Sequence, residues 1–437
     1  MDPVKKRLEE VGYPRAELLK KLVHEHGDKV IQEVTLEQVV SGMKGMVALL
    51  TDTSKLDANE GIRFRGYSIP ELREKLPKLK ADGEPLPEGL FYLMLIGELP
   101  TKEQVNFISK EWARRGQNIP QHAFDVIDAL PKSSHPMIQF NTAILAMSTE
   151  SHFRKAYMDG MDKKFYWDSM YEGVMDLISR LPIIAAYIYR RVFHNDDHIP
   201  MDPSLDWAAN LAHMMGHDNE EVKRLMRLYM VLHADHEGGN VSAHATHLVG
   251  TALSNPYYSF SAGMNGLAGP LHGMANQEVM VWLENLQKEI GTETPTKEQI
   301  KEYAIHTIEQ GRVIPGYGHA VLRKTDPRFT VQLDFAKKYI PDLPLIQLVS
   351  KIYEVVPDVL LATGKVKNPW PNVDAISGSL LASYGIKENP IYTVLFGVSR
   401  SLGVLSSLVW DRMYGMGLER PTSHPLEWYM EKFNFKG

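Results

Sequence analysis

Residues 391–410 read IYTVLFGVSRSLGVLSSLVW and predict a long helix that is buried on all sides. The run is long and apolar enough to cross a bilayer, but Arg400 stands at its centre, where a charge is costly in lipid. We therefore interpret it as a core helix. A buried guanidinium needs an anionic partner, and no carboxylate shares its face of this helix. The partner must come from elsewhere, and a distant Asp or Glu in a structural ion pair is the simplest alternative.

The chain on both sides of this run is also predominantly helical in pattern. Ala, Leu, Met, Glu and Lys dominate the long periodic stretches, and alternating strand patterns are scarce. Capping boxes at Thr101–Gln104 and Thr296–Gln299 predict two helix starts, the second helix ending near Gly311. Short extended pieces are expected near residues 30–36 and 61–69. These patterns predict an all-α, multi-helical protein.

Composition limits the function classes. The 437 residues suffice for two domains, and 44% of them are hydrophobic. The net charge of −6 gives no support to nucleic-acid or membrane-surface binding, so neither is expected as a partner. The absence of cysteine excludes disulfides, thiolate metal sites and a cysteine nucleophile. The first residues lack the apolar region of a signal peptide, and they carry acidic residues where a transit peptide avoids them.

Two histidines and an aspartate stand in turn-like sequence far apart along the chain. His272 lies in SAGMNGLAGPLHGMANQE, His319 in GRVIPGYGHAVLRKTDPR and Asp374 in KNPWPNVDAISG. Glycine- and proline-rich segments of this kind suit bends where a polar side chain approaches a ligand. We expect folding to bring these three groups together as an acid–base site.

Basic residues gather around the same segments. An acidic protein that places positive charge beside candidate acid–base groups is expected to bind a small, multiply anionic ligand, because arginine pairs well with carboxylates. For a single lysine of this set, a solvated surface position is the simpler interpretation. The basic residues are Arg312, Arg323, Lys324, Arg328, Lys365, Lys367 and Arg420.

Several other motifs resemble cofactor or metal sites but lack required residues. Gly316-Tyr317-Gly318 lacks the third glycine and the strand–turn–helix context of a dinucleotide fingerprint. His236-Glu237 begins like a zinc-protease helix, but Asn240 stands where the second histidine is required. His244 and His247 are one helical turn apart, yet such histidines are more often satisfied structural groups, so no metal is predicted.

Six sequence blocks, taken in order, resemble the citrate synthase family of the eukaryotic, mitochondrial type. The resemblance extends from about residue 30 to about residue 420. It implies an all-α homodimer with a large domain (1–274 and 381–437) and a smaller mobile domain (275–380) that closes over the substrates. It also implies condensation of acetyl-CoA with oxaloacetate and hydrolysis of citryl-CoA, with no cofactor or metal, in the mitochondrial matrix. The blocks are DHEGGNVSAH, MNGLAGPLHGMANQE, PGYGHAVLRKTDPR, KNPWPNVDAISG, LFGVSRSLG and LERP.

The resemblance also assigns roles to residues at matching positions. Asp374 would be the base that enolises acetyl-CoA, His272 the hydrogen-bond donor to the thioester oxygen, and His319 the group that polarises the oxaloacetate ketone. Oxaloacetate or citrate would be held by His236, Arg328, Arg400 and, across the dimer, Arg420. CoA would contact Lys44, Val313, Ile314, Gly316, Tyr317, Gly318, Arg323, Lys365, Lys367 and Asn372. Lys44 departs from the family, which usually has arginine there.

Two alternatives remain at this point. A 2-methylcitrate synthase would use propionyl-CoA with the same machinery, because one methylene is worth only about 1–3 kcal/mol of discrimination. A structural protein that has kept the fold for packing alone is the other alternative.

Overall fold

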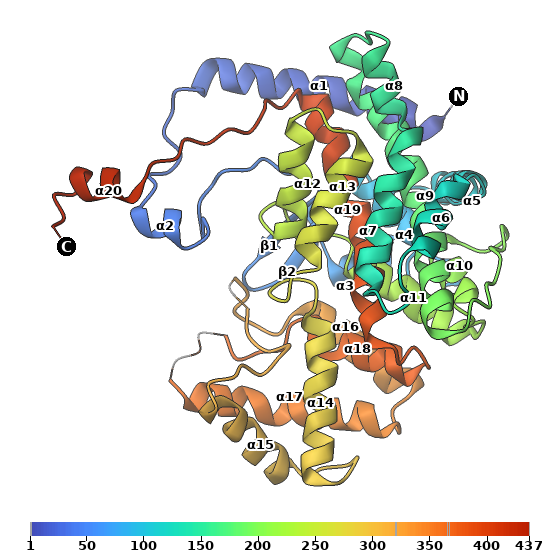
Figure 1. The fold of residues 1–437 in the computed structure, drawn as a ribbon, viewed down its shortest axis with the longest axis vertical. Helices are drawn as coiled ribbons and strands as arrows, with labels where there is room; N and C mark the ends of the chain where they lie inside the picture. Colours follow the sequence, from blue (N-terminus) through green and yellow to red (C-terminus); the bar gives the residue numbers. More distant parts are fainter. Residues whose placement is uncertain (1, 320, 365, 367, 437) are drawn as a thin grey trace.

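The computed structural model describes residues 2–319, 321–364, 366 and 368–436. This part of the chain is mostly helical, so the all-α prediction is confirmed (Figure 1). The helices are α1 (Pro3–His26), α2 (Leu36–Val40), α3 (Ile69–Lys75), α4 (Pro87–Ile96), α5 (Lys102–Gly116), α6 (Gln121–Ala129), α7 (Pro136–Ala146), α8 (His152–Met158), α9 (Tyr166–Phe193), α10 (Trp207–Met214), α11 (Glu220–Leu232), α12 (Val241–Thr251), α13 (Pro256–Leu267), α14 (Ala275–Ile290), α15 (Lys297–Glu309), α16 (Pro327–Tyr339), α17 (Pro344–Ala362), α18 (Asp374–Ser383), α19 (Tyr392–Tyr414) and α20 (Leu426–Lys432), with 3-10 turns η1 (Met147–Glu150), η2 (Lys163–Phe165) and η3 (Asn389–Ile391).

The apolar run that contains Arg400 forms α19, the central helix of the larger group of helices. It packs against α1, α4, α9, α12 and α13, and nearly all its residues are buried. The continuous helix from Asn389 to Tyr414 is long and apolar enough to span a membrane, but 94% of its most apolar window is buried inside the protein. The prediction of a buried core helix is confirmed.

Local sequence signals set several element boundaries. Thr101 and Thr296 both form capping boxes with the glutamine three residues later, as predicted. The extended segment expected at 61–69 is confirmed by two strands, whereas residues 30–35 form no strand among the described residues. That segment is irregular, and Thr35 caps α2 in place of pairing in a sheet.

A small antiparallel sheet stands beside the helices. Strands β1 (Ser54–Asp57), β2 (Gly61–Phe64) and β3 (Tyr67–Ser68) follow one another in order, and Ser54 pairs with Phe64 while Asp57 pairs with Gly61. Burial alternates along β1, with Ser54 and Leu56 buried and Lys55 exposed. The β1–β2 hairpin therefore presents one face to the protein interior.

Helices α14–α18 form a second group, at the bottom of Figure 1. They pack mainly on one another, through contacts between α14 and α18, α15 and α17, and α16–α18. The group begins at Ala275 and its last helix ends at Ser383. The division into a fixed large domain and a mobile small domain at 275–380 remains a prediction.

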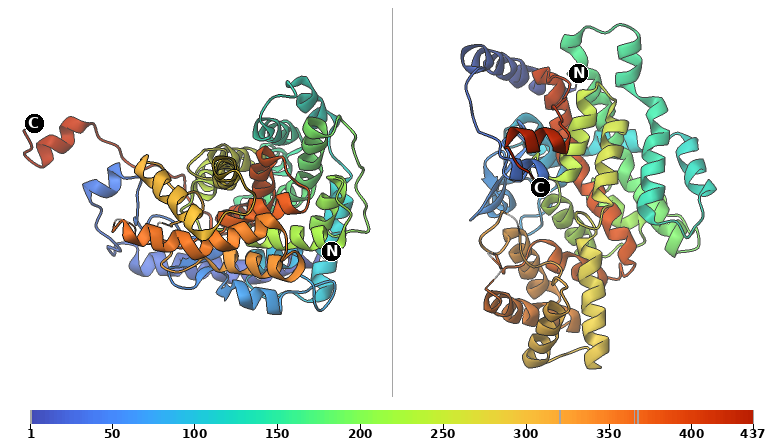
Figure 2. Two further views of the ribbon diagram at one scale, coloured as in Figure 1. Left: turned by 90° about the horizontal axis from the view of Figure 1, so that it is seen from below. Right: turned by 60° about the vertical axis from the view of Figure 1, so that its left-hand side comes forward.

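Two segments near the chain ends extend away from the body (Figures 1 and 2). Helices α2 and α20 contain no buried residue. Large apolar side chains on these segments lie in solvent, among them Val30 (82% exposed), Val40 (74%) and Leu426 (69%). The projecting segments therefore present an exposed apolar surface.

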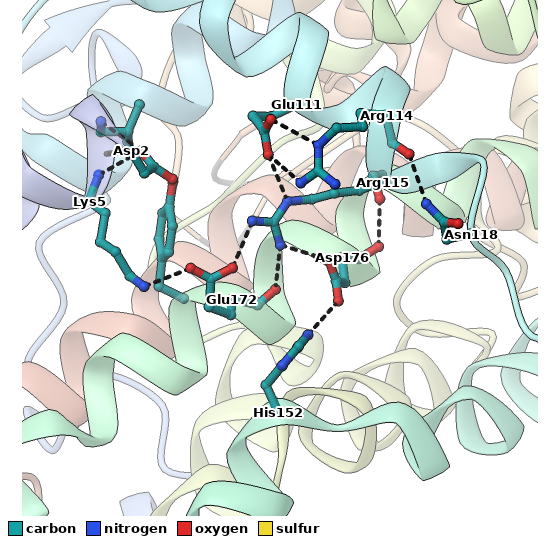
Figure 3. A network of polar contacts seen from close by, with 12 residues as sticks. Asp2, Lys5, Glu111, Arg114, Arg115, Asn118, His152, Glu172 and Asp176 are labelled. Atoms are coloured by element: carbon teal, nitrogen blue, oxygen red, sulfur yellow. Dashed lines mark hydrogen bonds and ion pairs between the residues drawn. The ribbon is translucent and has the colours of Figure 1, made fainter.

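A polar network joins four helices of the larger group (Figure 3). Arg115 of α5 donates to Glu172 and to Asp176 of α9, both at 2.7 Å. Lys5 of α1 donates to Glu172 at 2.6 Å, and the His152 ring of α8 lies 3.0 Å from Asp176. Glu172 and Asp176 of α9 each contact charged or polar side chains from other helices, so the network fixes the relative positions of α1, α5, α8 and α9.

Candidate active site

His236 lies in the loop between α11 and α12. Asn240, the N-cap of α12, donates its amide to the His236 carbonyl oxygen at 3.0 Å and so fixes the loop. The Nε2 atom of His236 is buried without a hydrogen-bond partner among the described residues. Burial, followed by the charges of Arg328 and Arg400, holds the pKa of His236 well below its usual value. The ring is therefore neutral and has an unused polar atom.

His272 lies in the turn between α13 and α14, outside any helix, as its glycine-rich surroundings predicted. The backbone N–H of Ser242 points at its Nε2 atom at 3.3 Å, and the Ser242 hydroxyl lies 2.9 Å away. Burial and the nearby Arg400 charge lower the pKa of His272 to about 3. An N–H can only donate, so Nε2 is an acceptor and the ring hydrogen is on Nδ1.

His319 belongs to the loop between α15 and α16. Its Nδ1 atom accepts the backbone N–H groups of Val321 and Leu322 at 3.0 and 3.1 Å. Burial, then Arg328, lowers the pKa of His319 to about 4. The neutral ring therefore carries its hydrogen on Nε2. Its centroid is 5.5 Å from that of His236, so the structure brings these two predicted residues together.

Asp374 is the first residue of α18, and its backbone N–H donates to the Asn372 side chain at 3.0 Å. Burial raises the pKa of Asp374 to about 6, against the opposing charges of Arg328 and Arg400. A carboxyl group with a raised pKa is a stronger base when ionised than an exposed aspartate.

The loops that carry His319 and Asp374 are hydrogen-bonded to each other. The Gly318 N–H donates to the Trp370 carbonyl at 3.0 Å, and the Asn372 N–H donates to the Gly316 carbonyl at 2.9 Å. Gly316 has φ of +78°, and a Cβ there would lie 2.7 Å from the Ala375 Cα. Only glycine fits this close approach, and it fixes the histidine loop against the start of α18.

Arg400 is 2% exposed. Its guanidinium donates to three neutral oxygens, namely the His233 carbonyl at 3.1 Å, Asn240 Oδ1 at 3.1 Å and Ser242 Oγ at 3.3 Å. Burial lowers the pKa of Arg400 to about 10, against the opposing Asp235 carboxylate, so it is charged at neutral pH. In the described part of the chain no carboxylate lies within ion-pair distance of the Arg400 guanidinium. The structural ion pair considered from the sequence is therefore not observed among these residues.

Arg328 is also buried, but it is paired. Its guanidinium makes a bidentate contact with Asp326, with Nη2 2.7 Å from Oδ2. Asp326 also caps α16 by accepting the Arg328 N–H at 2.9 Å. The sequence pattern Asp-Pro-Arg is a recognisable helix start, and it could have identified Asp326 as the partner. Asn240 and Ser242 were missed for another reason: only the tertiary fold brings them to Arg400 and His272.

The remaining predicted contacts for CoA lie partly beside this cluster and partly away from it. Val313 is 82% exposed, whereas Ile314 is buried and Tyr317 is half-buried. Arg323 is exposed and donates to the carbonyl groups of Val321 and Leu322. Lys365 and Lys367 lie outside the described residues.

Lys44 and Arg420 are not brought to the site within this chain. Lys44 is exposed just after α2 on the projecting N-terminal segment. Arg420 is exposed on the extended segment between α19 and α20. Both stay predictions, and Arg420 is the one expected to act in the partner's site.

The remaining histidine pair of the sequence, His244 and His247, contacts carboxylates. His244 lies 3.0 Å from Glu419, and His247 lies 2.8 Å from Asp411. Within residues 2–319, 321–364, 366 and 368–436, no three or more His, Cys, Asp or Glu side chains are grouped so that they could bind a metal ion. His244 therefore attaches the chain after α19 to α12, and His247 attaches the last turns of α19 to the same helix.

Known proteins match both the sequence and the fold. Residues 42–422 match the family described as citrate synthase, C-terminal domain. The chain belongs to the citrate synthase family. It is 55% identical to "Citrate synthase 4, mitochondrial" of Arabidopsis thaliana, over 97% of this chain and 89% of that one. It is 58% identical to "Probable citrate synthase, mitochondrial" of Glossina morsitans morsitans, over 93% and 87%.

Solved citrate synthase structures have the same fold. The enzyme from Pyrobaculum aerophilum superimposes with a TM-score of 0.77 at 27% identity, covering 92% of this chain and 100% of that chain. The citrate synthase of Thermoplasma acidophilum, solved as a ternary complex with carboxymethyl coenzyme A and oxaloacetate, has a TM-score of 0.73 at 24% identity, covering 88% and 94%. The all-α citrate synthase fold is thereby established.

Proposed function

We propose that this citrate synthase family member enolises acetyl-CoA with Asp374 and His272 and directs the enol at a ketone polarised by His319. The observation that carries the proposal is the state of the two histidines. Each accepts a backbone N–H on one ring nitrogen and so keeps a hydrogen on the other. Neutral imidazoles with one committed nitrogen are suited to donate hydrogen bonds to developing oxyanions.

The reaction follows from these protonation states. The Asp374 carboxylate takes a methyl proton from acetyl-CoA while the Nδ1–H of His272 donates to the thioester oxygen. The enol carbon forms a bond to the ketone carbon of oxaloacetate as the Nε2–H of His319 donates to the ketone oxygen. Water then cleaves the thioester of citryl-CoA and releases citrate and CoA. An α-proton of a thioester is weakly acidic, so base and oxyanion donor must act together.

Oxaloacetate would be held by His236, Arg328 and Arg400. Arg400 is the most informative of the three, because its buried charge lacks a carboxylate partner among the described residues, and a substrate carboxylate would supply one. Arg328 keeps Asp326 as its partner and would add a second positive charge. CoA would lie along the 313–318 loop, with phosphates near Arg323, Lys365 and Lys367. No resident cofactor or metal is part of this chemistry.

We further propose that the protein is a homodimer in which Arg420 completes the partner's site. The support is the exposed apolar surface of the projecting segments that contain α2 and α20, which a second copy would cover. The names of the relatives place those proteins in mitochondria, and the proposed compartment here is the mitochondrial matrix.

The first experiment is thiol release from acetyl-CoA with and without oxaloacetate, and from propionyl-CoA in parallel. The chain has no cysteine, so a thiol-reactive dye gives no protein background. We expect release that depends on oxaloacetate and favours acetyl-CoA. A preference for propionyl-CoA would instead indicate a 2-methylcitrate synthase, and a folded protein silent with both would refute the catalytic proposal.

A further inference from the structure

The hairpin formed by β1 and β2 contacts the His236 loop through both carboxylates that flank this histidine. Asp235 accepts the hydroxyl groups of Thr53 at 2.6 Å and Ser54 at 2.8 Å. Glu237 accepts the backbone N–H of Leu56 at 3.1 Å. In return, the Glu237 N–H donates to Ser54 Oγ at 2.8 Å. His236 is thus held on each side by the same strand.

Glu237 adopts an unusual backbone conformation at this point. Its φ is +55°, in the left-handed region that residues with a side chain rarely adopt. Such a conformation persists where surrounding contacts hold it, and it is common at functional sites. Here the two hydrogen bonds to the hairpin provide those contacts. Among the described residues no basic side chain pairs with the Glu237 carboxylate. The hydrogen bond from the Leu56 N–H is therefore the contact that holds this carboxylate.

The other end of the hairpin contacts the segment that carries His319 and Arg328. The Ala58 carbonyl in the β1–β2 turn accepts the Arg323 N–H at 2.7 Å. Gly61 lies directly against Pro327, since a Cβ added to Gly61 would be 2.5 Å from the Pro327 Cδ. In Figure 1 the hairpin accordingly lies beside the junction between the two groups of helices, next to α16.

We infer that the β1–β2 hairpin is a positioning element of the site, and that Glu237 is the positioning residue through which it orients His236 toward the His319 loop. The inference rests on the proposed role of His236 in holding oxaloacetate. In this proposal Glu237 acts through His236 and would not itself contact the substrate. Its loss should release the loop and weaken oxaloacetate binding while leaving the acetyl-CoA side of the site in place.

The test compares full-length variants by steady-state kinetics, with thermal unfolding to verify folding. We expect Glu237→Ala to raise the KM for oxaloacetate about tenfold, because a hydrogen bond to a charged acceptor is lost. The KM for acetyl-CoA should change less than about twofold. Glu237→Gln should restore most of the affinity, since its amide oxygen can accept the same N–H. Lys55→Ala, an exposed neighbour on β1, is the matched control and should behave as the parent.

Ser54→Ala provides a second, smaller change if Glu237→Ala does not fold. It removes the hydroxyl that links Asp235 and the Glu237 N–H, and it should raise the same KM. Suppose that the KM for oxaloacetate is raised in His236→Ala but unchanged in folded Glu237→Ala or Ser54→Ala. This result would overturn the inference about the hairpin and leave the proposed role of His236 intact. An unchanged KM in His236→Ala would overturn the proposed role of His236, and this inference with it.

Discussion

Asp374 must be ionised to act as a base, and its environment determines when it is. Burial raises the pKa of Asp374 to about 6, so the active carboxylate form predominates above that pH and is lost as pH falls through it. We expect kcat/KM for acetyl-CoA to fall about tenfold per pH unit below about pH 6. A pH–rate profile between pH 5 and 8 measures this. A profile that stays flat down to pH 5 would contradict the assignment.

Asp374→Asn removes the carboxylate base and leaves the size of the side chain unchanged. The amide cannot accept the methyl proton, so turnover should fall by at least about two orders of magnitude. The melting temperature should stay near that of the parent, since a neutral residue replaces a carboxylate that burial disfavours.

Arg400 provides a second prediction at this scale. Removing one partner of a buried, hydrogen-bonded charge pair costs about 2–5 kcal/mol, so Arg400→Ala should weaken oxaloacetate binding by roughly 30-fold or more. Titration calorimetry with oxaloacetate measures the affinity directly. Lys324→Ala, which removes an exposed charge, is the control. Equal affinities in the two variants would mean that Arg400 has a structural role only.

Sequence reasoning predicted which residues form the site but not how they are protonated. His272, His319 and Asp374 are recognisable because glycine and proline mark their turns and because their segments resemble a family. The backbone N–H groups that fix each ring come from Ser242 and Val321, and nothing local in the sequence indicates which ring nitrogen they meet. For His272 that information arises only when the distant Ser242 packs against the ring, whereas for His319 it depends on how the loop folds back on its own ring.

Among the elements, α19 depends on a glycine for its contact with the loop before His236. A Cβ at Gly403 would lie 2.4 Å from the Asp235 Cβ, and Gly403 N–H donates to the Ala234 carbonyl at 3.2 Å. Gly403→Ala should therefore destabilise the protein by about 1–3 kcal/mol through overpacking. Urea unfolding compares it with Gly417→Ala, where an added Cβ meets nothing within 4 Å. Equal unfolding free energies would contradict the close-packing argument.

Elements with local signals were predictable, and those without them were not. The capping boxes at Thr101 and Thr296 and the apolar run of α19 act within a few turns of chain, so the sequence alone indicates them. Residues 30–36 include strand-forming residues, but no strand in the described part of the chain pairs with them. Their apolar side chains are exposed, so the contacts of the described part of the chain do not account for their composition.

The whole molecule is expected to be a dimer with shared sites, and hybrid dimers test this. If Arg420 acts across the interface, a mixture of Arg420→Ala and Asp374→Asn subunits forms hybrids in which one site has neither defect. Random exchange at equal amounts should restore about a quarter of the parent activity. Each variant alone should remain nearly inactive. Absence of rescue, with subunit exchange demonstrated by mass spectrometry, would place Arg420 in its own subunit's site or outside any site.

The hydrogen bonds between the Gly316–Gly318 segment and residues 370–372 have a consequence for errors in catalysis. They join His319 and Asp374, the proposed ketone-polarising group and base, into one piece, whereas His272 is hydrogen-bonded to Ser242 on another. A fluctuation that displaces the piece carries both groups away from the thioester at the same moment. With the proposed roles, the base would not be presented to acetyl-CoA without His319 beside it. Proton exchange at a thioester that has no polarised ketone next to it would then be suppressed by the connectivity of the backbone itself.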